Sequence, residues 1–152
     1  MKKILRSLFI VALPIIVGAL SGFLIRNNVY IYDILAKPPF SLPNNLFSVV
    51  WGVLYLTMGV SLLLYLRDDY NSEGLLLFAI QLFLNFSWSI VFFNFKAFLA
   101  AFILLVVLFV FVALTIANFY KVNKLSGILL IPYLLFLIYA GYLNFGVWYL
   151  NM

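Results

Sequence analysis

Long apolar segments dominate the chain, and its few charged residues divide it into five blocks. Uncharged stretches of 19, 29, 22, 24 and 28 residues begin after Arg6, Lys37, Glu73, Lys96 and Lys124. A helix needs about 20 residues to cross the hydrocarbon core of a bilayer, so each block is long enough to span a membrane. The pattern predicts five transmembrane helices, at about residues 5–26, 44–66, 74–94, 97–120 and 125–149.

The blocks are apolar on every side, which favours helices over barrel strands. Residues 103–110 are all Ile, Leu, Val or Phe, whereas strands of a membrane barrel alternate between apolar and polar side chains. Of the 152 residues, 68% are hydrophobic and 9% are charged, against about half and a quarter in soluble domains. We predict an all-α integral membrane protein, a bundle of five transmembrane helices that forms a single domain over residues 1–152.

The first block has two interpretations. Lys2, Lys3 and Arg6 before an apolar run, with small residues beyond it, also fit a signal peptide and its cleavage site. The run is long for a signal, however, and Gly18 and Gly22 form a GxxxG element that allows another helix to approach closely. The residues favour a retained helix without excluding a signal peptide.

The distribution of basic residues predicts the orientation. Six Lys and Arg residues lie on the side of the N-terminus, the second loop and the fourth loop, and three lie on the other side. Because cytoplasmic loops carry the excess of positive charge, we expect the N-terminus in the cytoplasm. The basic residues lie at helix ends, next to lipid head groups, so the net charge of +5 does not indicate a nucleic-acid partner.

Several kinds of chemistry are excluded by composition. The chain has no His and no Cys, which removes disulfides, thiolate chemistry, zinc sites and the usual haem ligands. We therefore expect no metal site. No Asp, Glu, Lys or Arg lies in the interior of a predicted span, which argues against proton-coupled transport or an ion pathway.

The connection over residues 27–43 is the longest and contains three prolines, which stiffen it. Long loops in compact folds often act as lids over binding sites, and we expect this loop to cover one end of the bundle. The alternative is an interfacial anchor in which Tyr30, Tyr32 and Phe40 lie among lipid head groups.

Polar and aromatic residues inside the spans indicate a cavity. Gln81, Asn85 and Trp88 recur at helical spacing on one face, which suits either hydrogen bonds between helices or contact with a ligand. Trp51 and Trp88 fall inside spans, where an indole N–H is more useful lining a cavity than facing lipid. An aromatic pocket of this kind suits a large, flat ligand.

Three motifs in order resemble a known family. They are Lys37–Pro43 followed by Val50-Trp51, Leu84-Asn85 with Trp88, and Pro132-Tyr133-Leu134 with Leu143-Asn144 and Trp148. Together they are similar to the TspO/MBR family of tryptophan-rich sensory proteins and translocator proteins, in its bacterial form. The resemblance implies a retained first helix, a homodimer in the bacterial cell membrane, and porphyrins (protoporphyrin or haem) and benzodiazepine-type drugs as ligands, with no obligatory cofactor.

The resemblance also implies a pocket beneath the first loop. Carried over by position, its lining residues are Tyr32, Pro43, Phe47, Ser48, Val50, Trp51, Asn85, Trp88, Ser89, Phe136, Ala140 and Leu143. We add Lys37 at the rim, where its ammonium group can meet a porphyrin propionate.

Three functions follow from the resemblance. The leading hypothesis is a receptor or sensor for porphyrins in tetrapyrrole homeostasis or stress regulation. The second is a light- and oxygen-dependent enzyme that degrades protoporphyrin and uses Trp51; Phe136, which replaces a family Trp and is harder to oxidise, weakens it. The third is a translocator of porphyrins or lipids, for which the chain shows no evident inverted repeat.

Overall fold

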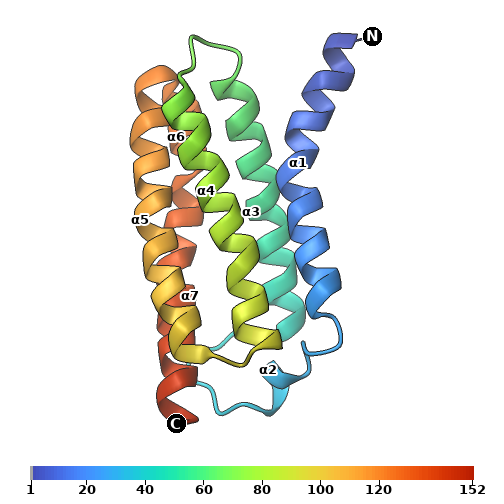
Figure 1. Cartoon of the computed structure of the whole chain (residues 1–152), viewed down its shortest axis with the longest axis vertical. Coiled ribbons are helices and arrows are strands. Elements are labelled where there is room, and N and C mark those ends of the chain that lie inside the picture. The colour runs from blue at the N-terminus through green and yellow to red at the C-terminus, as the bar shows by residue number, and fades with distance from the viewer. Residues whose placement is uncertain (1) are drawn as a thin grey trace.

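The computed structural model describes residues 2–152, and all the regular structure in that range is helical (Figure 1). The elements are α1 (Lys2–Ile25), α2 (Ile31–Ile34), α3 (Asn44–Tyr65), α4 (Ser72–Ser89), a π-helical turn η1 (Ile90–Asn94), α5 (Phe98–Val122), α6 (Lys124–Leu129) and α7 (Ile131–Leu150). Five segments are long and apolar enough to cross a membrane: Lys3–Ile25, Asn44–Tyr65, Ser72–Asn94, Phe98–Val122 and Lys124–Leu150. The predicted number and positions of the spans are confirmed.

The third and fifth spans are less regular than the hydrophobic pattern indicates. The third ends in the π-helical turn η1. The fifth is divided at Leu130 into α6 and α7, with Pro132 in the first turn of α7. Proline has no N–H for the helical ladder, and the start of a helix is where this loss costs least. The single helix expected over 125–149 is therefore two helices.

The helices run alternately up and down, so that α2 and the C-terminus lie at one end of the bundle and the N-terminus at the other (Figure 1). Helix α1 packs on α3, α4 packs on α5, and α5 packs on both α6 and α7. The N-terminal end of α1 leans away from the other helices (Figure 1). Helix α1 is thus the least enclosed span, because 11% of the residues in its apolar segment are buried, against 28–33% in the other four spans.

Two glycines allow α1 to approach α3. A Cβ atom on Gly59 would overlap the carbonyl oxygen of Val11, and one on Gly18 would overlap the Tyr55 ring. Gly22, the second glycine of the predicted GxxxG element, faces open space. Close packing of α1 and α3 therefore depends on Gly18 and Gly59.

Buried polar residues connect the helices. Asn85 in α4 accepts a hydrogen bond from Tyr55 Oη of α3 at 2.6 Å and donates one to Tyr133 Oη of α7 at 2.7 Å. Ser61 and Ser126 exchange hydrogen bonds to each other's carbonyl groups at 2.7 Å. Such bonds contribute about 0.6–2 kcal/mol each inside a membrane protein, so they fix the relative positions of α3, α4, α6 and α7.

The glycine contacts give a matched stability test within α3. Gly59→Ala should lower the free energy of unfolding by about 1–3 kcal/mol, the usual cost of overpacking, because the new methyl group collides with the backbone of α1. Gly52→Ala enters open space and should be neutral or stabilising by up to about 1 kcal/mol. Thermal unfolding in detergent measures both changes, and equal stability of the two variants would contradict the packing argument.

Candidate functional site

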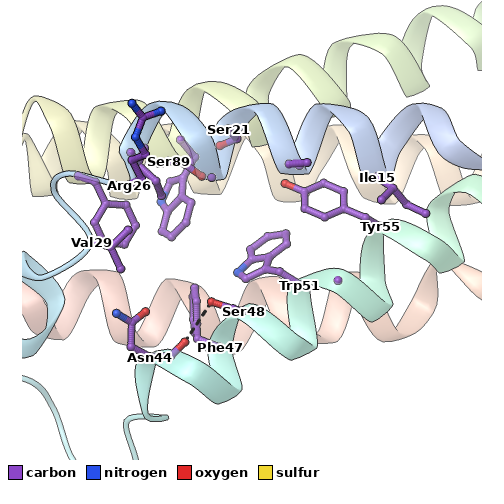
Figure 2. A pocket seen from close by; sticks show the side chains of 17 residues that line it. Ile15, Ser21, Arg26, Val29, Asn44, Phe47, Ser48, Trp51, Tyr55 and Ser89 are labelled. Carbon is purple, nitrogen blue, oxygen red and sulfur yellow. Dashed lines mark hydrogen bonds between the residues drawn. The ribbon is translucent and has the colours of Figure 1, made fainter.

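The main cavity lies between α1, α3 and α4, in the half of the bundle nearest α2 (Figure 2), and has a volume of about 610 Å³. It is bounded by Ile15, Gly18, Ala19, Ser21, Gly22 and Ile25 of α1, by Arg26 and Val29 in the turn after it, by Asn44, Phe47, Ser48, Trp51, Gly52 and Tyr55 of α3, and by Trp88, Ser89 and Phe93 of the third span. Its volume falls in the range of about 300–1,000 Å³ that is typical of ligand sites.

Trp51 and Trp88 form the aromatic wall of this cavity. Their ring centroids are 6.2 Å apart with an interplanar angle of 29°. Phe136 of α7 meets Trp51 edge-on, with a centroid distance of 5.5 Å. The indole N–H of Trp88 donates to Asn144 Oδ1 at 2.9 Å, so that ring is fixed before any ligand arrives. The result is a rigid apolar surface for a flat molecule.

Two polar groups of α1 line the same cavity. Ser21 is 2% exposed, and its hydroxyl group has no hydrogen-bond partner among the described residues. A buried hydroxyl group without a partner is rare in native proteins, and a ligand atom in the cavity would satisfy it. Arg26 lies at the rim, where its guanidinium group stacks on the Phe23 ring at 3.8 Å and donates weakly to the Phe23 carbonyl group at 3.4 Å. Most of its five N–H donors are therefore available to an anion.

A second cavity, of about 20 Å³, lies on the other side of Phe47 and Trp88. Both residues line both cavities, and the small one is also lined by Tyr32, Ala140, Leu143 and Asn144. Its volume is close to that of one water molecule. The predicted pocket is thus divided by an aromatic partition into a large chamber beside α1 and a small one beside α7.

The predicted lining residues fall into three groups. Phe47, Ser48, Trp51, Trp88 and Ser89 line the main cavity, and Tyr32, Ala140 and Leu143 line the small one. The other residues support these walls. Phe136 packs against Trp51, Val50 packs against the core, Asn85 is 1% exposed in its hydrogen-bond network, and Pro43 precedes the first turn of α3.

Lys37 is held by the loop itself. Its ammonium group donates to the carbonyl oxygen of Tyr32 at 2.7 Å and to those of Asp33 and Leu35 at 3.3 Å. These bonds satisfy carbonyl groups around the short helix α2. Contact between Lys37 and a propionate stays a prediction, and it requires these bonds to be exchanged.

The connection before α3 is fastened to α7 across the end of the bundle. Tyr139 Oη donates to the Phe40 carbonyl group at 2.7 Å and accepts from the Leu42 N–H at 3.1 Å, and Tyr142 Oη donates to the Pro39 carbonyl group at 3.0 Å. The Asn151 side chain pairs with both backbone groups of Ala36. We call these contacts the latch.

Phe40, which the latch binds, has a strained backbone, and Tyr32 lies beside the latch with its phenol protonated. Phe40 has a φ of 63°, a left-handed conformation that costs about 1–2 kcal/mol in a residue other than glycine. Tyr32 lies beneath the loop, where burial raises the pKa of its phenol, with a further contribution from Tyr139. Tyr32 donates to the Leu42 carbonyl group at 3.1 Å, and its raised pKa keeps this donor protonated above the pH at which a free phenol ionises.

Sequence reasoning missed the whole contribution of α1 to the main cavity. The small residues Gly18, Ala19 and Gly22 were a possible signal, but a GxxxG element predicts helix packing more readily than it predicts a hollow. In the sequence, Arg26 is visible only as the charge that ends the first apolar block. Its position at the rim follows from how α1 crosses α3, which the sequence pattern does not contain.

Comparison with known proteins agrees with this architecture. The TspO/MBR family model matches residues 10–150. The tryptophan-rich protein TspO of Chlorobaculum tepidum is 37% identical, over 99% of this chain and 98% of its own. The protein CrtK of Rhodobacter capsulatus is 36% identical, over 79% and 78% of the two chains. The translocator protein of Sus scrofa is 33% identical, over 88% and 85%.

The match extends through all five spans of the structure. It confirms the resemblance that the loop, Asn-Trp and Pro-Tyr motifs indicated. The chain is a multi-pass membrane protein, and it belongs to the TspO/MBR family.

Proposed function

We propose that this protein is a membrane receptor that binds porphyrins and other flat hydrophobic molecules, among them benzodiazepine-type ligands, in the main cavity. The observation that carries the proposal is the wall formed by Trp51 and Trp88 beside a hollow of about 610 Å³. Ligand sites are typically apolar and aromatic with a few polar groups, and Ser21 and Arg26 supply those groups. Such a receptor can report tetrapyrrole levels to the cell.

The cavity suggests how the ligand lies. The macrocycle stacks on the Trp51 side of the wall, its acidic groups reach Arg26 at the rim, and one polar atom meets the Ser21 hydroxyl group. Protoporphyrin suits this site better than haem, because the chain has no His or Cys to bind the iron. Arg26 is an alternative to Lys37 as the partner of a porphyrin propionate, because a guanidinium group can donate two hydrogen bonds to one carboxylate.

Oligomeric state and topology also belong to the proposal. We propose a homodimer in the bacterial cell membrane with the N-terminus in the cytoplasm, where Arg67, Lys121 and Lys124 lie on the same side as the N-terminal charges. The main cavity then lies in the outer half of the bilayer, near α2.

The stacking wall can be tested by truncating its central ring. Trp51→Ala should weaken protoporphyrin binding at least tenfold, which corresponds to about 1.4 kcal/mol, since the ring supplies both apolar area and aromatic contact. Trp148→Ala is the control, because Trp148 packs on Phe145 near the end of α7. Titration of the Soret band gives both affinities, and equal losses in the two variants would contradict a site at Trp51.

The two cations can be distinguished by ligand charge. Arg26→Gln should weaken protoporphyrin binding about tenfold and leave a neutral benzodiazepine-type ligand unaffected, since only the porphyrin carries carboxylates. Lys37→Gln should change both ligands to a similar extent, because it disturbs the loop around α2. A selective loss of porphyrin with Lys37→Gln and none with Arg26→Gln would assign the propionate contact to Lys37.

One observation favours the enzyme as a second candidate. Although Phe136 replaces the family Trp, Trp88 lies against Trp51 at 6.2 Å, so a second indole ring is available to share a radical formed on Trp51 under light and oxygen. If the protein is a receptor, illumination of its protoporphyrin complex in air should leave the Soret band as stable as with Trp51→Phe. Loss of the band with a new product, dependent on Trp51, would favour the enzyme.

A further inference from the structure

We propose that ligands reach the main cavity sideways from the membrane, through a window between α1 and α3, and not past the connection that covers the end of the bundle. This inference rests on the proposed function, since it concerns the entry of the same ligand into the same site. The window is the side of the cavity that the Trp51 and Trp88 wall leaves open, between α1 and α3.

The exposed residues of the cavity lie on two helices only. Ile15, Ala19 and Gly22 of α1, Arg26 at its end, and Ser48 and Gly52 of α3 are exposed, whereas Trp88 on the opposite wall is 5% exposed. A Cβ atom added to Gly22 or Gly52 would meet no atom within 4 Å. The border between α1 and α3 is therefore exposed and carries small residues at Ala19, Gly22, Ser48 and Gly52, with Ile15 and Arg26 beside them.

The window is built into the way α1 crosses the bundle. Toward its N-terminus, α1 contacts α3 at Gly59. Toward its C-terminus, it is tied instead to the third span, where Asn94 Nδ2 donates to the Leu24 carbonyl group at 3.3 Å and Asn28 Nδ2 donates to Asn94 Oδ1 at 2.8 Å. Beyond Gly18, which packs on the Tyr55 ring of α3, α1 is fastened to the third span, and the cavity lies between its last turns and α3.

The end of the bundle is fastened by the latch. Side chains of α7 bind the connection at Ala36, Pro39, Phe40 and Leu42, and Pro38 packs against Gly146. Entry by that route would require several of these bonds to break together. The sideways route requires only that lipid leave the window.

The groups in the window match a ligand that is already dissolved in the bilayer. Arg26 lies at the end of α1, close to the head groups, while Trp51 lies about two turns into α3. A flat molecule with a carboxylate at one edge adopts this arrangement in a membrane, its ring in hydrocarbon and its charge at the interface. The unpaired Ser21 hydroxyl group, 2% exposed inside the cavity, gives such a molecule a hydrogen bond after it enters.

A thiol label that blocks the window and can be removed by reduction tests the sideways route. The chain has no cysteine, so Gly52→Cys can be labelled in detergent with benzyl methanethiosulfonate and returned to vesicles. Stopped-flow quenching of tryptophan fluorescence by protoporphyrin in those vesicles measures association. The label should slow both association and dissociation at least tenfold, with a smaller change in Kd, and dithiothreitol should restore both rates. Val53→Cys, on the lipid-facing side of α3, is the labelled control and should keep wild-type rates.

Release of the latch is the opposite test. Tyr139→Phe combined with Asn151→Ala should leave the association rate within twofold of the wild type. Faster association in this variant, or wild-type rates in labelled Gly52→Cys, would overturn the sideways route while leaving the receptor intact. Absence of binding by the wild-type protein would instead overturn the proposed function and this route with it.

Discussion

The contact between Gly59 and the backbone of α1 at Val11 determines the shape of the rest of the molecule. With no Cβ atom at Gly59 or at Gly18, which faces the Tyr55 ring, α1 lies directly on α3 at these two levels. The main cavity opens on one side of α1. A third, wholly apolar hollow of about 610 Å³ opens on the other side, between α1, α3 and α4 toward the N-terminal end. Two hollows of similar volume thus flank α1.

The polar interior complements this loosely packed helix. Asn85, Ser61 and Asn144 each join two or more spans, so that α3, α4, α5, α6 and α7 form a fixed frame. In hydrocarbon, a polar side chain without a partner is costly, and these residues therefore specify which helices are neighbours. Helix α1 takes little part in this network. The site consequently has a rigid aromatic wall on the frame and a less constrained wall on α1.

The Trp51 and Trp88 pair connects this frame to function. Trp88 is oriented by Asn144, and Trp51 is surrounded by Phe47, Tyr55, Tyr133 and Phe136. A ligand stacking on this wall meets rings that are already in position, so little ordering energy is lost on binding. The same closeness of the two indole rings, whose centroids are 6.2 Å apart, would also suit radical chemistry on Trp51.

The sequence by itself determined the class of protein, the five spans and the family. Apolar blocks longer than about 20 residues can satisfy their backbone groups in lipid only as helices, and three ordered motifs are specific enough to identify relatives. It also indicated Phe47, Ser48, Trp51, Trp88 and Ser89, which all line the main cavity. The break at Leu130 and the helix α2 escaped the hydrophobic pattern, since both depend on local backbone geometry.

Only the tertiary structure decided which side of the aromatic wall is hollow. Residues assigned to one pocket lie on both faces of a Phe47 and Trp88 partition, Lys37 is turned into the loop, and Arg26 stands at the rim. A residue's spacing along a helix fixes which neighbours share its face, but the angle at which another helix crosses that face depends on contacts far apart in sequence. Here those contacts are Gly59 with Val11 and Asn94 with Leu24, and together they leave the space in which a ligand can lie.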